Sequence, residues 1–330
     1  MKEQDIRPEK LFNRYLELSA EDATRCFKGV KREKIPCVAC GYVGEKMEFE
    51  KNGFSYSSCE DCGSLFQTPR PLQDAFENFY RYSVSSRFWA EQLFPAVAES
   101  RRELIFRPRV EKLSSFFFEE GLRIERLVDV GAGYGIMLDE WRRLHPETSL
   151  LAIEPFQSLA SECRSKGFEV VEDIAENVSG YQEWADLVVC FEVLEHVFDP
   201  HSFIDSLKKL VRPGGYLFIS TLGVDGFDIK VLWEKSKSIF PPHHINFMSI
   251  VGFQKLFERS GFEKINVKTP GLLDVDIVRN AFHINPKILD EQRFIRSIIL
   301  NDETSQAFQL FLSQFNLSSH TWVTGKKVER

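Results

Sequence analysis

The sequence predicts an α/β fold, in which a largely parallel sheet carries helices on both faces and follows a small metal-binding segment. From residue 119 onward, short apolar runs alternate with amphipathic stretches, which is the pattern of strand–helix–strand units. A glycine-rich turn comes directly after the first of these apolar runs. Two closely spaced cysteine pairs lie nearer the N-terminus.

Before the sheet, the chain divides into three stretches. Residues 1–30 contain an expected helix at Leu11–Cys26, and residues 31–68 hold the cysteine pairs. Residues 69–118 are rich in Phe, Tyr and Arg and predict a helical linker. This linker either packs between its neighbours or closes over a binding site as a lid.

Residues 119–330 form the predicted sheet domain, with an amphipathic helical insertion at 271–318 before the last strand. Its expected strands and helices follow from apolar runs and helical periodicity. The expected strands are Leu127–Val130, Leu150–Ile153, Glu169–Val171, Leu187–Phe191, Tyr216–Ser220, Phe262–Lys268 and Thr321–Lys327, and the clearest helices are Ile136–Leu144 and Phe203–Val211.

Composition and charge exclude several classes of protein. The chain has 330 residues, of which 43% are hydrophobic and 28% charged, the usage of an ordinary globular protein. Its 42 basic and 49 acidic residues give a net charge of −7, which disfavours a nucleic-acid partner. No apolar run approaches the roughly 18 residues of a membrane helix, and the N-terminus lacks the apolar core of a signal peptide. We expect a cytoplasmic protein with no membrane partner, of undetermined oligomeric state.

Four of the seven cysteines predict a structural zinc site. Cys37-Val-Ala-Cys40-Gly is followed, after 18 intervening residues, by Cys59-Glu-Asp-Cys62-Gly. Two residues between cysteines allow one tight turn to present both thiolates to one metal, and the following glycine tolerates a positive φ. A segment this short gains much of its stability from the metal. The alternatives are buried free thiols or a redox pair.

The glycine-rich turn predicts a ligand site at the end of a strand. Leu127-Val-Asp129-Val-Gly131-Ala132-Gly133-Tyr-Gly135 ends a strand and opens a helix. A dinucleotide fingerprint needs its third glycine at position 136, where this chain has isoleucine. Asp129 can meet a cationic amino group. Glu154, which ends the next strand, can accept hydrogen bonds from both hydroxyls of a ribose.

These segments resemble the class I S-adenosylmethionine-dependent methyltransferases. The resemblance continues through Asp186–Pro200 and through Leu210-Val-Arg-Pro-Gly-Gly-Tyr-Leu-Phe-Ile, and covers about 119–270. It implies a Rossmann-like seven-stranded sheet, closed by the strand at Thr321–Lys327, and S-adenosylmethionine as the methyl donor. The methionine part would lie at Asp129 and the glycines, the ribose at Glu154 and the adenine at Asp173. The full set of expected cofactor-binding residues is Asp129, Gly131, Ala132, Gly133, Gly135, Glu154, Pro155, Asp173, Ile174, Cys190 and Phe191.

An acid–histidine cluster follows the fourth strand of the expected sheet. Glu192, Glu195 and His196 are spaced i, i+3, i+4, which predicts that one helical face presents all three. The motif resembles that of small-RNA 2′-O-methyltransferases and ubiquinone-pathway O-methyltransferases, whose cluster can hold a divalent metal. A Mg²⁺ ion would suit two carboxylates and substrate oxygens. The alternative is that the cluster is structural, as in metal-free relatives.

Two further histidines, His243 and His244, follow Pro241-Pro242. Either one is a candidate general base if the acceptor is a hydroxyl, although a lone histidine is more often a hydrogen-bonded structural residue. The candidate catalytic residues are therefore His244, His243, His196 and Glu192.

The functional expectation is methyl transfer to a small-molecule acceptor. Many bacterial members of the family that carry a four-cysteine ribbon act in sugar, polysaccharide or natural-product pathways. The resemblance thus implies O- or C-methylation of a sugar, nucleotide-sugar or glycan precursor. An RNA methyltransferase that grips RNA with its ribbon is a second hypothesis, which the acidic net charge disfavours. A non-catalytic S-adenosylmethionine-binding protein is a third.

Overall fold

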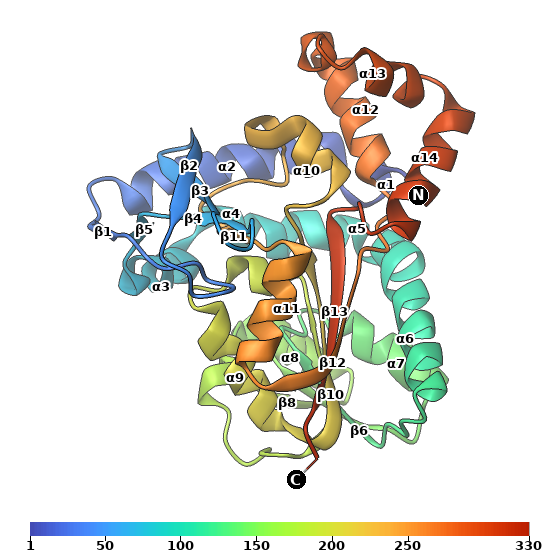
Figure 1. Cartoon of the computed structure of the whole chain (residues 1–330). Helices are drawn as coiled ribbons and strands as arrows, with labels where there is room; N and C mark the ends of the chain where they lie inside the picture. Colours follow the sequence, from blue (N-terminus) through green and yellow to red (C-terminus); the bar gives the residue numbers. More distant parts are fainter. Residues whose placement is uncertain (330) are drawn as a thin grey trace. The chain divides into compact units, whose positions relative to one another are not determined.

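The computed structural model describes residues 1–329 and divides the chain into two compact units (Figure 1). The sheet unit comprises Glu99–Thr221, Phe253–Val267 and the chain from Trp322 onward. The ribbon unit comprises Met1–Ala98, Leu222–Gly252 and Lys268–Thr321.

The sheet unit is built on one seven-stranded sheet, with strand order β12-β13-β10-β9-β6-β7-β8. Neighbouring strands from β10 to β8 are parallel, and Val128 of β6 pairs with Leu151 of β7 and Val188 of β9. All the strands expected from the sequence are present. Their bounds are β6 (Arg126–Val130), β7 (Ser149–Ile153), β8 (Glu169–Val171), β9 (Ala185–Phe191), β10 (Val211–Leu222), β12 (Phe262–Lys268) and β13 (His320–Lys327).

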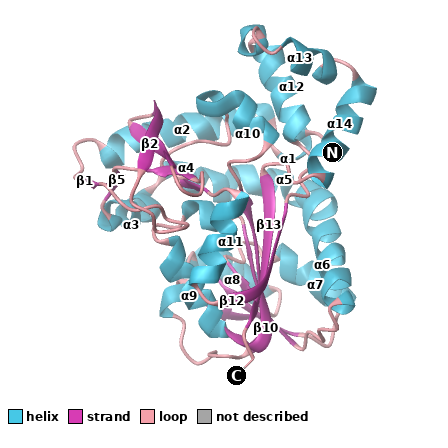
Figure 2. Ribbon diagram, in the orientation of Figure 1, coloured by secondary structure: helices cyan, strands magenta, loops and turns pink. Residues whose placement is uncertain are grey.

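Helices cover both faces of this sheet, as the alternating pattern predicts (Figure 2). On one face lie α6 (Arg107–Glu119) and α7 (Ile136–Leu144), and on the other lie α9 (Pro200–Leu210) and α11 (Ile250–Arg259). Shorter elements are η2 (Arg102–Phe106), α8 (Gln157–Ser165), η3 (Ala175–Asn177) and η4 (Leu194–His196). The core between α6, α7 and the sheet is apolar and includes Leu113, Phe117, Trp141, Val189 and Phe218. Burial of these side chains stabilises the packing of α6 and α7 on the sheet.

The ribbon unit begins with two helices and a small antiparallel sheet. α1 spans Glu3–Ile6, and α2 (Glu9–Phe27) is the expected helix extended by two residues at its start and one at its end. The face that α2 buries carries Phe12, Tyr15 and Leu18, at the spacing of an amphipathic helix. The remaining early elements are β1 (Arg32–Glu33), β2 (Glu45–Lys51), β3 (Phe54–Cys59), β4 (Leu65–Gln67), β5 (Arg70–Pro71), α3 (Gln73–Tyr82), α4 (Val84–Phe88), η1 (Trp89–Leu93) and α5 (Phe94–Arg101).

A strand from much later in the chain completes the small sheet. Its strand order is β11-β4-β3-β2, and β11 (Asn246–Phe247) pairs with β4 through Asn246 opposite Phe66 and Phe247 opposite Leu65. The sequence analysis did not predict β11. The loop that ends in β11 contains both His243 and His244, so the small sheet anchors the histidine loop, residues 236–249.

The expected helical insertion is also present in the ribbon unit. It contains α12 (Asp274–Ile284), η6 (Pro286–Leu289), α13 (Arg293–Ile299) and α14 (Asp302–Gln314). These pack together through Val278, Phe282, Ile299 and Leu312, with Leu232 from α10 (Phe227–Leu232), which precedes η5 (Trp233–Lys235). Among the described helices, none has both the length and the apolar character required to cross a membrane.

Candidate active site

The glycine-rich turn at the end of β6 has a backbone conformation that favours glycine. Gly131, Gly133 and Gly135 all have positive φ, at 73°, 55° and 68°. A Cβ on Gly131 would lie 2.6 Å from Val193 Cγ2, whereas a Cβ on Gly133 would meet open space. Gly131 is therefore required by the protein's own packing, and Gly133 leaves a space that a ligand can approach.

Asp129 lies beside this turn and is buried at 2% exposure. Burial, and secondarily the charge of Glu154, raises its pKa to about 8. Its Oδ1 atom has no hydrogen-bond partner among the described residues. Buried polar atoms are nearly always paired, so this orphaned acceptor is what a cationic group of a ligand would satisfy.

Glu154 follows β7 and faces the same turn. Gly133 N donates to its Oε2 at 2.8 Å, and Phe156 N donates to its Oε1 at 3.0 Å. Burial raises the pKa of Glu154, and these two backbone bonds oppose the rise. Each carboxylate oxygen has lone pairs left for further donors, so the position fits a pair of ligand hydroxyls.

The other expected cofactor residues lie at the same edge of the sheet. Asp173 and Ile174 follow β8, where Ile174 N and Asn177 Nδ2 donate to Asp173 Oδ1 and the Ile174 side chain is exposed. Cys190 and Phe191 end β9 and are buried, and Ala132 and Pro155 adjoin the turn and Glu154. The carboxyl ends of parallel strands are where open α/β sheets bind ligands.

The acid–histidine cluster has a different local structure from the one expected. Glu192 has a φ of 55° and lies outside any helix, and only Leu194–His196 form a short 3₁₀ turn. The prediction of one helical face is therefore wrong. The chain turns sharply at Glu192 because its N–H bonds to Ser220 O at 2.8 Å, across the ends of β9 and β10. A non-glycine residue in this conformation is strained, and such strain concentrates at functional sites.

Arg109 supplies the positive charge that faces these acids. Arg109 Nη1 donates to Glu192 Oε1 at 3.2 Å, and Ser220 Oγ donates to the same atom at 2.8 Å. Thr221 Oγ1 donates to Glu195 Oε2 at 2.7 Å, and burial, followed by the charge of Glu192, raises the pKa of Glu195 to about 8. Glu192 is thus paired with Arg109, and the raised pKa of Glu195 favours its neutral form. These contacts do not support a Mg²⁺ ion at the two carboxyl groups.

His243 is buried in the ribbon unit within a cage of aromatic rings. Its ring lies 4.9 Å from that of Phe79, 5.4 Å from that of Tyr15 and 5.6 Å from that of Phe240, measured between centroids. Its Nε2 is 2.8 Å from Ser85 Oγ. His244 lies next to it, with Nδ1 2.7 Å from the carbonyl oxygen of Ser238.

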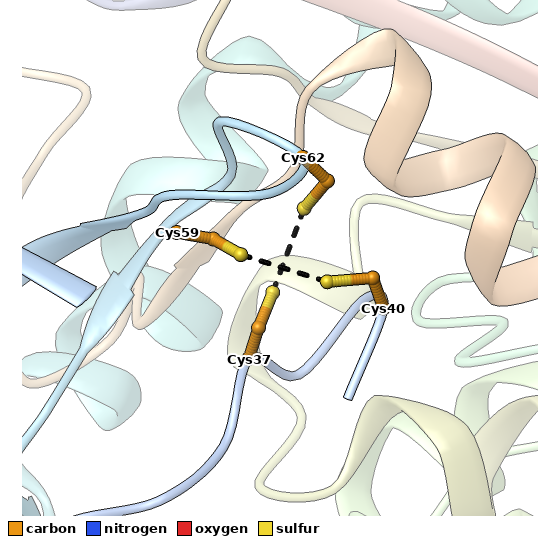
Figure 3. A group of neighbouring side chains, drawn as sticks. All are labelled: Cys37, Cys40, Cys59 and Cys62. Carbon is orange, nitrogen blue, oxygen red and sulfur yellow. Dashed lines mark hydrogen bonds between the residues drawn. The ribbon is translucent and has the colours of Figure 1, made fainter. Parts of the chain in front are cut away.

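The four cysteines converge on one point, as the spacing predicts (Figure 3). Cys37 Sγ lies 3.6 Å from Cys62 Sγ, Cys40 Sγ lies 3.5 Å from Cys59 Sγ, and all four atoms lie within 4.8 Å of one another. Tetrahedral zinc with bonds of about 2.3 Å places its sulfurs about 3.8 Å apart, so the cluster is compatible with zinc. The glycines after each pair have positive φ, 77° at Gly41 and 76° at Gly63.

Hydrogen bonds tie the cysteine ribbon to the histidine loop. Tyr56 OH donates to His244 O at 2.6 Å, and Gln67 N donates to Ile245 O at 3.0 Å. Ser249 Oγ donates to Cys62 O at 2.5 Å, and Ser249 N donates to Ser64 Oγ at 3.1 Å. The loop that presents both histidines is therefore held by residues next to the cysteine cluster.

Comparison with known proteins agrees with this fold. The profile of the family described as "Methyltransferase domain" matches residues 90–267. The ubiquinone biosynthesis O-methyltransferase of Proteus mirabilis is 34% identical over 150 residues, which cover 42% of this chain and 57% of that protein. The protein of that name from Salmonella arizonae is 35% identical over 111 residues, which cover 32% of this chain and 46% of the relative. The chain thus spans about half the length of the curated relatives it matches.

A solved structure shows the same fold over most of the chain. The plantazolicin methyltransferase BpumL, determined with SAH, superimposes with a TM-score of 0.50 at 14% identity and covers 77% of this chain and 94% of its own. The fold and the family match together define a class I S-adenosylmethionine-dependent methyltransferase. The chain belongs to the Methyltransferase domain family.

Three kinds of polar residue around these sites were missed by sequence analysis. Arg109 lies in the expected helical linker but was not singled out, Ser220 ends an expected strand, and Thr221 lies just beyond it. Asp22 and Ser85 gave a weak signal, because Asp22 is an acid on the apolar face of α2. Only the folded chain brings each of them to its partner.

Proposed function

We propose that this protein transfers a methyl group from S-adenosylmethionine to a hydroxyl oxygen of a small-molecule acceptor. The observation that carries the proposal is the site formed by Asp129, the glycine turn and Glu154, where a buried carboxylate oxygen has no partner. The matched relatives named O-methyltransferases support oxygen as the acceptor atom. An ordinary hydroxyl must lose a proton to become a good nucleophile, and the candidate bases are residues of this chain.

On the donor side, we assign three roles to the sheet unit. Asp129 binds the amino group of the donor, the amides and open space of the glycine turn accommodate its methionine part, and Glu154 binds the ribose. Asp173, Ile174, Cys190 and Phe191 complete the donor pocket. When bound, the donor supplies a sulfonium-activated methyl group. The protein contributes alignment, which is the main requirement of an in-line transfer.

On the acceptor side, the reaction forms one bond and breaks another. The acceptor oxygen attacks the methyl carbon, the carbon–sulfur bond breaks, and its electron pair remains on sulfur. The hydroxyl proton passes to a base, for which His243, His244, His196 and Glu192 are the candidates. Of these candidates, Glu192 lies at the end of β9 and accepts hydrogen bonds from Arg109 and Ser220.

We also propose that the four cysteines bind structural zinc. The hydrogen bond with Cys37 lowers the pKa of Cys62 and raises that of Cys37, so within this pair the thiolate forms first at Cys62. Four sulfurs fill the coordination sphere and leave no open position for substrate, which suits a structural role.

The chemical class of the acceptor is the most specific part of the proposal. A sugar, nucleotide-sugar or glycan precursor follows from the ribbon-bearing members that the sequence resembles, whereas the relatives matched here are named for ubiquinone biosynthesis. Both classes offer a hydroxyl. The test must therefore cover them together and must include RNA, the acceptor of the competing hypothesis.

The test is transfer of an isotopically labelled methyl group from S-adenosylmethionine into three pools: a small-molecule extract, a lipid extract and total RNA. We expect a labelled methyl ether in one of the first two pools, identified by mass spectrometry. Glu154→Ala should abolish it, while Glu162→Ala, which changes an exposed acid on α8, should not. Label in RNA alone, or on carbon in a small molecule, would contradict the proposal.

A further inference from the structure

The glycine-rich turn after β6 is held by side chains at the C-terminal end of α8. Cys163 Sγ donates to Gly133 O at 3.3 Å, and Lys166 Nζ donates to Tyr134 O at 2.5 Å. The two acceptors are consecutive carbonyl groups of the turn, and all four residues belong to the sheet unit. Two side chains that lie 30 and 32 residues later in the chain therefore bind the middle of the turn.

The same segment packs against the last glycine of the turn. A Cβ on Gly135 would lie 3.2 Å from Cys163 Sγ and 3.3 Å from Phe168 Cε2, so the absence of a side chain permits this close approach. A Cβ on Gly133, in contrast, would meet no atom within 4 Å. The turn is thus packed against the α8 segment at Gly135 and leaves room for a ligand at Gly133.

Contacts with these carbonyl groups determine how the peptide groups of the turn are oriented. A trans peptide group is planar, so its C=O and its N–H point in opposite directions. The bonds from Cys163 and Lys166 therefore orient the amides of Tyr134 and Gly135. Glycine gives the backbone more conformational freedom than any other residue, so a turn rich in glycine needs outside contacts to keep one conformation.

Both side chains have the protons that these bonds require. Burial, and secondarily the charge of Asp129, raises the pKa of Cys163 to about 12, so the thiol keeps its proton and can donate. The ammonium group of Lys166 lies 3.4 Å from Asp139 Oδ2 and 3.7 Å from Glu162 Oε1, both farther than the carbonyl oxygen that it contacts. A bond from a charged donor is stronger than one from a thiol, so Lys166 should contribute more than Cys163.

We propose that Lys166 and Cys163 are positioning residues of the methyl-donor site, which hold the glycine turn in the conformation that receives S-adenosylmethionine. This inference rests on the proposed function, because it takes the donor to lie at Asp129, the glycine turn and Glu154. Neither positioning residue needs to touch the donor. Without their contacts the turn would populate other conformations, and the apparent donor affinity would fall by the fraction of protein that remains competent to bind.

The end of α8 offers matched variants for the test. Lys166→Met removes the ammonium group but keeps a long side chain, and Lys166→Arg restores a cationic donor. Cys163→Ala removes the thiol, and Cys163→Ser keeps a donor of similar size. Arg164→Met is the control, because Arg164 lies on the same helix and pairs with Glu172 Oε2 at 2.7 Å.

Calorimetric titration of the full chain with S-adenosylmethionine tests the proposal without an acceptor. We expect Lys166→Met to weaken donor binding about tenfold and Cys163→Ala about threefold, with partial recovery in Lys166→Arg and Cys163→Ser. Arg164→Met should stay within about twofold of the wild type. Unchanged affinity in both Lys166→Met and Cys163→Ala would overturn the proposal. If Lys166→Met does not fold, the comparison of Cys163→Ala with Cys163→Ser decides by itself.

Kinetics of labelled-methyl transfer distinguish positioning of the donor from a general structural role. We expect Lys166→Met to raise the KM for S-adenosylmethionine about tenfold and to leave kcat within about twofold, because saturating donor selects the competent turn. A lower kcat and a lower thermal midpoint with an unchanged donor KM would make the contacts structural and would overturn the inference, while leaving methyl transfer itself standing. Wild-type protein that binds no S-adenosylmethionine would instead refute the proposed function, and with it the role of both residues.

Discussion

Two buried aspartates, one in each unit, have opposite electrostatic environments. Asp22 in the ribbon unit is 1% exposed and accepts from Ser83, Ser85 and Arg25, and its pKa is lowered. Asp129 in the sheet unit is 2% exposed, keeps one oxygen without a partner, and has its pKa raised to about 8. Similar burial thus favours the charged form of the carboxyl group in one place and the neutral form in the other.

The difference lies in the number of donors, and it separates two roles. A carboxylate whose lone pairs are used by its own chain has nothing left for a ligand and acts on its neighbours, as Asp22 acts on Ser85. A carboxylate that is buried without donors is unstable as an anion until something else supplies the positive charge. This contrast supports the ligand-binding role proposed for Asp129, and it fits a structural role for Asp22.

The largest effect is expected at the cysteine ribbon, which belongs to the same unit as Asp22. Cys59→Ser should release zinc and unfold the ribbon sheet, because a small cysteine ribbon depends on its metal for stability. Metal analysis and thermal unfolding should show zinc loss and a separate low-temperature transition, with the sheet unit still folded. Cys26→Ser, which changes a thiol outside the cluster, is the control. Wild-type protein without zinc would refute this prediction.

Replacement of the two aspartates should separate their roles directly. Asp22→Ala should destabilise the protein by roughly 1–3 kcal/mol, because it leaves the buried amide and hydroxyl donors of Ser85 without their acceptor. Asp129→Asn should leave the thermal midpoint unchanged or slightly higher, yet weaken donor binding by about tenfold to a hundredfold. Chemical denaturation and calorimetric titration measure the two effects. Equal destabilisation by both variants would contradict the comparison.

The pH dependence of donor binding should show the neutral state of Asp129. Because its pKa is about 8 in the free protein, Asp129 is protonated at pH 7 and must release that proton to pair with a cationic amino group. Donor affinity contributed by this group should rise as the pH increases toward 8. Conversely, the folded state holds a proton that the unfolded state has lost, so this group's contribution to stability falls over the same increase in pH.

Calorimetry in two buffers of different ionisation enthalpy measures that proton. We expect release at pH 6.5 in the wild type and no such release with Asp129→Asn. A wild-type protein that binds the donor without releasing a proton would show that Asp129 is already ionised.

The smallest expected effect is at the contact between the ribbon and the histidine loop. Tyr56→Phe removes the 2.6 Å bond to His244 O and should cost about 1 kcal/mol of stability, with zinc content unchanged. Methyl transfer should fall severalfold if the loop carries the base. Tyr42→Phe, at an exposed ribbon position, should change neither quantity. An active, equally stable Tyr56→Phe would show that the loop is held by its other contacts.

Local signals explain what could be predicted from the sequence. The strands of the large sheet are short apolar runs, and the two cysteine pairs have the spacing of a four-cysteine site, so the strands and the convergence of the four thiols were predicted closely. β11 has two residues, too few for any periodicity, and its partner strand lies about 180 residues earlier. The helical reading of Glu192 failed because a hydrogen bond to Ser220 across the sheet outweighs the i, i+3, i+4 pattern. Asp22 and His243 lie 221 residues apart and meet only in the folded chain.

The pairing of β11 with β4 has a consequence for how such proteins can be recombined. If recombination between two related proteins exchanged residues 31–68 alone, the small sheet of the product would contain a β11 and a histidine loop from the other parent. The original contacts of the ribbon with β11 and with this loop would be lost. A crossover that also carried residues 236–249 would move the four cysteines and both histidines together. The cysteine ribbon and the histidine loop are therefore expected to be inherited as one piece, although nearly 170 residues separate them in the chain.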